Sequence, residues 1–143
     1  MKYKIEIAPD QTEDLVIYAK EDSETLGRIK AMLSELDASV YGYGSDTAVK
    51  LVAEDVYCFF TEGSRIYAEC DGGRLLVKER LYQIEEIFSD SFVKINQSCL
   101  VNVSKIKKFE SSIGGSLKVI LKNGYKDYIS RRQLKAVKRR LGI

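Results

Sequence analysis

The order of apolar and polar positions predicts two strands and one helix in the first 37 residues. Residues 2–8, KYKIEIA, alternate apolar and charged side chains, which is typical of a half-buried strand that ends at Pro9 and Asp10. Residues 15–19, LVIYA, predict a second strand. Residues 22–37 begin with two cap candidates and then repeat apolar side chains at helical spacing, which predicts an amphipathic helix. The caps are Asp22 and Ser23, and the apolar positions are Leu26, Ile29, Leu33 and Leu36. We expect a ββα unit that cannot fold alone.

After residue 38 the chain consists of short apolar runs separated by turns, which predicts strands. We expect them at residues 39–43, 48–52, 56–61, 65–70, 74–77, 92–95, 106–111, 116–121 and 126–129. Residues 98–106, SCLVNVSKI, are expected to form a compact turn. Hairpin turns are predicted at residues 71–73, 114–115 and 123–124, the last of which is Asn-Gly, the strongest short hairpin signal.

Two further helices are predicted, a short one within residues 78–88 and a basic one at residues 131–141 behind the cap Ser130. Strands and helices do not alternate as they would in a parallel sheet. A hairpin rather than a helix precedes the last helix, so no helix-turn-helix pattern is present. We therefore expect a mainly β fold (α+β by content) of antiparallel sheets with short helices.

Charge is distributed very unevenly behind an overall net charge of +2. Residues 1–62 carry 6 Lys and Arg against 13 Asp and Glu, a net of −7, whereas residues 91–143 carry 13 against 2, a net of +11. Two basic runs lie in this half, at residues 105–110 (KIKKFE) and 130–140 (SRRQLKAVKRR), and each alone is typical of a solvated face. Both runs in one half of the chain, with almost no acid between them, favour attraction to a polyanion.

Several chemistries are excluded by composition. Cys58, Cys70 and Cys99 stand far apart without a CxxC pair, which argues against a disulfide framework and a zinc site. The chain has no histidine and no GxxxxGK[ST] loop, so the common nucleophile pairs, metal helices and phosphate loops cannot be built. We expect no catalytic centre, no metal and no cofactor. No apolar run reaches the roughly 20 residues of a membrane helix, and no signal peptide is visible, so we expect a cytoplasmic protein.

Residues 92–106, FVKINQSCLVNVSKI, combine an apolar frame with amides, hydroxyls and lysines and contain no carboxylate. Any half-buried strand and turn would show a similar mixture, and this interpretation stays open on spacing alone. Together with the charge distribution, the same groups favour contact with a nucleic-acid backbone.

Three segments in order, residues 51–70, 92–110 and 121–141, resemble the LytTR DNA-binding domain of bacterial transcription regulators. The shared features are an aspartate-led strand that enters a loop, the pattern F-x-[RK]-x-x-x-S-x-x-V-N-x-x-x-I, and N-G followed by S-R-R before a helix. The likeness covers about residues 45–143. It implies antiparallel sheets that place loops, not a recognition helix, into successive major grooves of duplex DNA.

The resemblance implies two sets of DNA-binding residues. The base-reading positions are Ser64, Arg65, Asn96, Gln97, Arg131 and Arg132. The phosphate-binding positions are Lys78, Arg80, Lys94, Ser98 and Lys105. The chemistry agrees, because Arg suits guanine, Asn and Gln suit adenine, and cations and hydroxyls suit phosphates.

The chain also departs from the family. Many members carry an aromatic residue or His in the first loop and His in the second, where this chain has Ser64, Arg65 and Asn96, so base preference cannot be transferred. In most family members a receiver domain precedes the DNA-binding domain, and residues 1–44 of this chain are too few to form one. The chain therefore resembles stand-alone LytTR regulators, whose signals commonly arrive through a partner such as a membrane protein.

We expect a homodimer on promoter direct repeats, with residues 1–44 lying on the sheet away from DNA and contributing to the dimer contact. Two alternative functions are an RNA-binding or protein-interaction module that uses the same basic face, and an enzyme. RNA binding would favour exposed aromatic residues, which are few in the basic half. An enzyme would need a polar partner set, which the acidic residues 10–24 lack.

Overall fold

The computed structural model describes residues 1–37 and 39–143, without the side chains of residues 34–37. The helices are α1 (Glu24–Asp37), α2 (Leu81–Ile87) and α3 (Arg131–Leu141). The strands are β1 (Val40–Tyr43), β2 (Ala48–Leu51), β3 (Val56–Glu62), β4 (Arg65–Cys70), β5 (Gly73–Val77), β6 (Phe92–Asn96), β7 (Cys99–Asn102), β8 (Ile106–Ser111), β9 (Leu117–Leu121) and β10 (Lys126–Ile129). None of the described helices is long and apolar enough to cross a membrane.

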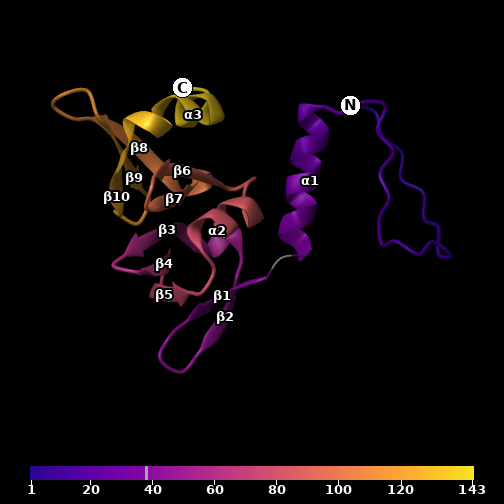
Figure 1. The fold of residues 1–143 in the computed structure, drawn as a ribbon, viewed down its shortest axis with the longest axis horizontal. Coiled ribbons are helices and arrows are strands. Elements are labelled where there is room, and N and C mark those ends of the chain that lie inside the picture. The colour runs from indigo at the N-terminus through magenta and orange to yellow at the C-terminus, as the bar shows by residue number, and fades with distance from the viewer. Residues whose placement is uncertain (38) are drawn as a thin grey trace.

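The strands form two antiparallel sheets, which confirms the predicted mainly β fold. The first has seven strands in the order β2-β1-β5-β4-β3-β7-β6, and the second has three in the order β10-β9-β8. Helix α3 packs beside β6, where the two sheets meet, while α1 and the N-terminal residues stand on the other side of the molecule (Figure 1). Strand β1 pairs with both β2 and β5, so the sheet includes residues before position 45.

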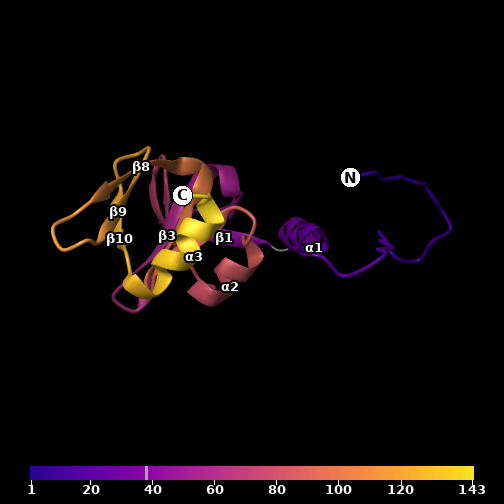
Figure 2. The same ribbon diagram turned by 90° about the horizontal axis from the view of Figure 1, so that it is seen from above.

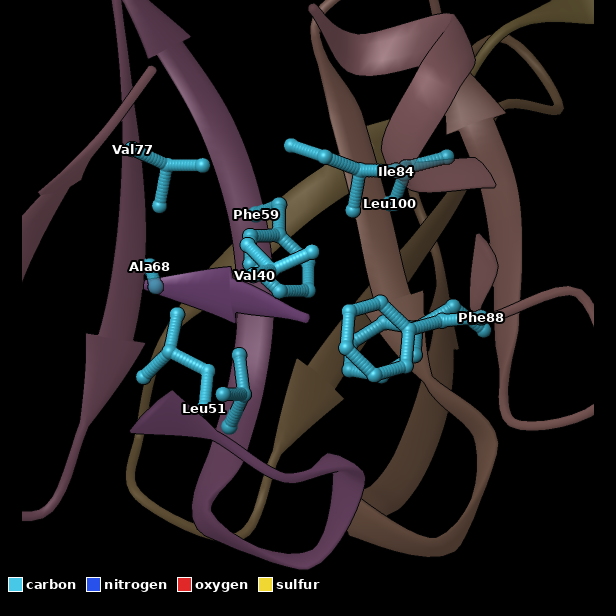
Figure 3. Close-up of a cluster of buried hydrophobic side chains, with 10 residues drawn as sticks. Val40, Leu51, Phe59, Ala68, Val77, Ile84, Phe88 and Leu100 are labelled. Atoms are coloured by element: carbon cyan, nitrogen blue, oxygen red, sulfur yellow. The ribbon is translucent and has the colours of Figure 1, made fainter. Parts of the chain in front are cut away.

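The first hydrophobic cluster lies between the seven-stranded sheet and α2. It consists of Val40, Leu51, Val56, Phe59, Ala68, Val77, Ile84, Phe88, Phe92 and Leu100 (Figure 3). The ring of Phe59 lies 5.7 Å from that of Phe88 and 5.1 Å from that of Phe92, measured between centroids. Helix α2 therefore closes this face of the sheet through Ile84 and the residue that follows its last turn, Phe88.

The second cluster joins the two sheets and α3. It consists of Cys58, Phe60, Val93, Ile95, Cys99, Val101, Val119, Leu121, Ile129 and Val137. Because successive side chains of a strand point to opposite faces, β3 sends Phe59 to the first cluster and Cys58 and Phe60 to the second. A single strand thus links both halves of the core.

The N-terminal region differs from the prediction. The helix forms as α1, but the described residues 2–8 and 15–19 form no strand, and every residue from 1 to 25 is exposed. A strand needs a neighbour for its backbone groups and an apolar surface for one face, and this chain supplies neither here. The expectation that the extension lies on the sheet is also wrong, because α1 contacts α2 and the arm before it projects away (Figure 2).

A second difference concerns residues 98–106. Instead of one compact turn, they contain strand β7, whose four residues are all buried between β3 and β6, and a 3-10 turn at Val103–Lys105. A strand buried on both faces shows no alternation, which is why the periodicity did not reveal it. The helix expected within residues 78–88 begins at Leu81, because the backbone of Arg80 is extended.

Asn102 is a buried polar residue that joins β7 to the chain before β3. Its Nδ2 donates hydrogen bonds to the carbonyl oxygens of Ala53 at 2.8 Å and Val56 at 2.9 Å. Its Oδ1 accepts from the backbone N–H of Ser104 at 3.0 Å and from the Ser104 hydroxyl at 2.8 Å. The amide is therefore fully used by the fold.

We predict that Asn102→Ala lowers the free energy of unfolding by about 2–4 kcal/mol, because two carbonyl groups and Ser104 lose their partners at once. Urea denaturation measures this loss. Ser104→Ala is the control, since it removes a single exposed partner, and it should cost less than about 1 kcal/mol. Equal losses in the two variants would show that the buried amide does not hold this junction.

Candidate nucleic-acid interface

Three connections between elements meet at one end of the seven-stranded sheet. They are the β3–β4 turn at residues 63–64, the β6–β7 turn at residues 97–98, and the β10–α3 junction at Ser130. The backbone N–H of Thr61 donates to the carbonyl of Ser98 at 2.8 Å, and that of Ser130 donates to the carbonyl of Ile95 at 2.8 Å. The three loops predicted to read bases therefore lie side by side.

A groove with a volume of about 790 Å³ lies beside these connections. It is lined by six of the residues predicted to bind DNA: Ser64, Arg65, Lys78, Arg80, Lys94 and Gln97. Two carboxylates, Glu79 and Glu85, also line it. The four cationic side chains outnumber them, so the groove carries a net positive charge.

The β3–β4 turn presents Ser64 and Arg65 as exposed side chains. Gly63 permits the tight turn with a φ of 63°, in the left-handed region that glycine tolerates. The neighbouring carboxylate of Glu62 pairs with the Arg74 guanidinium at 2.6 Å, and this guanidinium also lies 4.9 Å from the centre of the Phe60 ring. The acid closest to the turn is therefore neutralised by the protein itself.

The adjacent amides of Asn96 and Gln97 have different environments. Asn96 is half-buried, and its Nδ2 donates to the carbonyl of Tyr128 at 2.9 Å while its Oδ1 accepts from the N–H of Ser98 at 2.8 Å. The side chain of Gln97 is exposed and forms no hydrogen bond with the described residues. Asn96 thus ties the turn to β10, and Gln97 is the amide that faces outward. Ser98 is also exposed. Its backbone carbonyl accepts from the N–H of Thr61, and its backbone N–H donates to the Oδ1 of Asn96.

Arg131 and Arg132 occupy the first turn of α3, where both are exposed. Ser130 caps the helix by accepting from the N–H of Gln133 at 3.3 Å. At the other end Arg140 donates to the carbonyls of Ser89 at 2.9 Å and Asp90 at 2.7 Å. Caps and anchors at both ends hold the N-terminus of α3 next to the β6–β7 turn.

Lys105 does not join this group. It follows β7 at the end opposite the β6–β7 turn, and its Nζ lies 5.0 Å from the centre of the Tyr57 ring. Lys78 lines the groove, but its Nζ lies 4.3 Å from the centre of the Tyr43 ring. The structure therefore brings together all the predicted DNA-binding residues except Lys105.

Sequence patterns did not reveal the role of Tyr82 in the groove wall. This side chain is 66% exposed in the first turn of α2, off the apolar face that packs on the sheet. The sequence signal that could have indicated this residue is an aromatic side chain outside the apolar repeat of a short helix. Glu79, which also escaped prediction, has one carboxylate oxygen, Oε2, that is buried without a hydrogen-bond partner.

The thiols of Cys58 and Cys70 are held in their protonated form. A hydrogen bond with Cys99, together with burial, raises the pKa of Cys58 above its ordinary value. Burial raises the pKa of Cys70 to about 11. A thiol with such a raised pKa supplies little thiolate at neutral pH, so these two groups are poorly suited to nucleophilic chemistry.

We predict that Asn96→Ala lowers the free energy of unfolding by about 1–2 kcal/mol, because the carbonyl of Tyr128 and the N–H of Ser98 lose a partner. Gln97→Ala is the matched control and should leave stability unchanged within about 0.5 kcal/mol. Thermal and urea denaturation of both variants test the difference. A Gln97 variant as unstable as the Asn96 variant would contradict the assignment of these two amides.

Comparison with known proteins agrees with this fold. The family model of the LytTr DNA-binding domain matches residues 46–142. Proteins called uncharacterized HTH-type transcriptional regulators in Staphylococcus aureus strains NCTC 8325 / PS 47 and N315 are each 29% identical over 146 residues, which covers 100% of this chain and 99% of each relative. The LytTr DNA-binding domain of a Bacillus cereus protein described as a methyl-accepting/DNA response regulator superposes with a TM-score of 0.69 at 20% identity, over 74% of this chain and 99% of that one.

The names of the Staphylococcus relatives mention a helix-turn-helix, but in the described part of this chain no two helices follow each other across a short turn. Strands separate α1 from α2 and α2 from α3. The family match extends over more than half of the chain and includes all three loops of the interface. The chain therefore belongs to the LytTR family of DNA-binding domains.

Proposed function

We propose that this protein is a transcription regulator that binds a specific sequence in duplex DNA by placing its three adjacent connections into the major groove. The observation that carries the proposal is the set of backbone hydrogen bonds that brings Arg65, Gln97 and Arg132 to one end of the sheet. Arg can bond the O6 and N7 atoms of guanine, and Gln can bond the N6 and N7 atoms of adenine. The regulator names of the Staphylococcus relatives support the same role.

We assign phosphate contacts to the cationic wall of the groove, Lys78, Arg80 and Lys94, and to the exposed hydroxyl of Ser98. Duplex DNA carries one negative charge per about 1.7 Å of helix axis, so a groove of net positive charge beside the base-reading loops suits its backbone. Such contacts position the protein without reading sequence. Lys105 is placed outside this set because of its distance along β7 from the loops.

The N-terminus of α3 supports the same orientation. Its first turn contains two arginines and no acid, although the N-terminal end of a helix carries a partial positive charge. Two cations there cost about 0.3–1 kcal/mol each in the isolated protein. A phosphate at this end would offset the cost, since helix N-termini bind anions through free N–H groups.

We further propose that two copies bind direct repeats in a promoter, in the cytoplasm, and that a regulatory partner supplies the input signal. This role involves binding and no enzymatic step. A footprint of the purified protein on the promoter of its own transcript and of neighbouring genes would define the site. Protection that is equal on all duplexes would contradict sequence-specific regulation.

We predict that Arg132→Ala weakens binding to that site by about 1–3 kcal/mol and scarcely changes binding to random duplex DNA, because a base contact is lost. Titrations of both duplexes at one salt concentration measure the ratio of the affinity for the specific site to the affinity for random duplex. Arg139→Ala, an exposed arginine near the other end of α3, is the control and should leave the ratio unchanged. Equal losses on both duplexes would make Arg132 a phosphate contact.

We predict that Lys94→Met, which keeps most of the aliphatic stem, weakens binding to specific and random DNA alike and reduces the slope of log K against log salt concentration by about 1. Lys122→Met is the control, because Lys122 lies beside Lys105 at the distant end of β7. Titrations over a series of salt concentrations test this. A slope that stays unchanged in the Lys94 variant would remove this residue from the phosphate contacts.

A further inference from the structure

Exposed apolar side chains are concentrated in the first 32 residues. More than half of the large exposed hydrophobic residues described in the structure lie there: Met1, Tyr3, Ile5, Ile7, Leu15, Val16, Ile17, Tyr18 and Met32. Tyr3 is 82% exposed and Ile5 is 76% exposed. Contiguous apolar surface of this kind on a folded chain marks an interaction site.

Most of these residues line an open hollow that no described part of the chain fills. It has a volume of about 960 Å³ and lies between residues 1–6, residues 15–21 and the first turns of α1. Tyr3, Ile5, Ile17, Leu26 and Ile29 are among the side chains that line it. The packed interior of a protein leaves no void of this size, so the apolar lining of this open hollow lacks the contacts that a core would provide.

The chain's own β domain cannot fill the hollow. Both views place α1 between the N-terminal arm and the sheets, so the arm lies on the far side of the helix (Figures 1 and 2). The backbone in residues 2–8 and 15–19 forms no ladder with described residues, although its alternation is that of a strand. The same segments thus combine exposed apolar side chains with strand-like backbone that forms no ladder.

Charge indicates what the occupant is. Residues 1–37 carry 9 acids against 5 basic residues, which disfavours DNA and anionic lipid. Within this region, residues 1–8 carry two lysines and one glutamate, whereas residues 10–24 carry six acids and one lysine. Around a two-fold axis, the lysine-bearing segment of one copy can face the acidic segment of another, and the contact is made twice.

We propose that residues 1–37 form a dimerisation unit, in which the two strand-like segments and α1 pack on the same elements of a second copy and complete a shared sheet. The second copy offers the three features that the hollow lacks: apolar side chains, free strand edges and the complementary charge. Dimerisation stands independently of DNA, but its use in joining two half-sites rests on the proposed function. The unit lies away from the DNA-binding loops, so both contacts can exist together (Figure 1).

Sedimentation of the full-length chain tests the proposal. We expect the wild type to sediment with twice the mass of one chain at about 10 μM. In the double variant Ile5→Asp, Ile17→Asp, the dissociation constant of the dimer should rise about 100-fold or more, because each aspartate would be buried without a partner. Ile113→Asp is the matched control, since Ile113 is fully exposed in the β8–β9 connection, outside the unit. This control should remain dimeric.

Hydrogen exchange provides a second measurement. Amides in residues 2–8 and 15–19 should be protected in the wild-type dimer and unprotected in the double variant. The double variant should still bind a single half-site, which shows that its β domain is folded. A wild-type chain that stays monomeric at about 100 μM, or a double variant that dimerises like the wild type, would overturn the proposal. If neither the wild type nor the variants bind DNA specifically, the proposed function fails while the dimerisation result still stands.

Discussion

The fold depends on the burial of strand β3 from both of its faces. Phe59 packs against both Phe88 and Phe92 on the α2 side, while Cys58 and Phe60 enter the cluster shared with the second sheet and α3. Burying one large apolar side chain stabilises a fold by about 1.5–3 kcal/mol. Strand β3 buries such side chains on both of its faces. Both sheets and two helices are therefore held in relation to one strand, and the end of that strand leads directly into the first loop of the candidate interface.

The interface follows from this arrangement because the fold uses backbone groups and one half-buried amide to join the loops. Thr61 bonds to Ser98, Ser130 bonds to Ile95, and the Asn96 side chain reaches Tyr128. The side chains left exposed, such as Gln97 and Arg132, are free for a ligand while their backbone is already ordered. A surface ordered before binding loses less conformational entropy when it meets its partner.

Charge and apolar surface separate two ends of the molecule. The groove beside the loops has more cations than carboxylates, and the N-terminal unit is acidic and carries most of the exposed apolar side chains. On bound DNA, electrostatic repulsion would keep the acidic unit away from phosphates. One chain can therefore present one surface to nucleic acid and another to protein without competition between them.

The sequence by itself determined most of the strand-and-turn order after residue 38 and the charge division, because alternation and turn glycines such as Gly124 are local properties. The three loops followed from the resemblance to the LytTR domain. Only the tertiary structure decided the rest. Strand β7 is buried on both faces and so shows no period, and the adjacent amides of Asn96 and Gln97 are distinguished only by Tyr128, 32 positions away from Asn96. Lys105 lies near the loops in sequence but a whole strand away in space. The N-terminal strands remain unformed because their periodicity specifies an apolar face, while the described residues of the rest of the chain offer no surface that covers it.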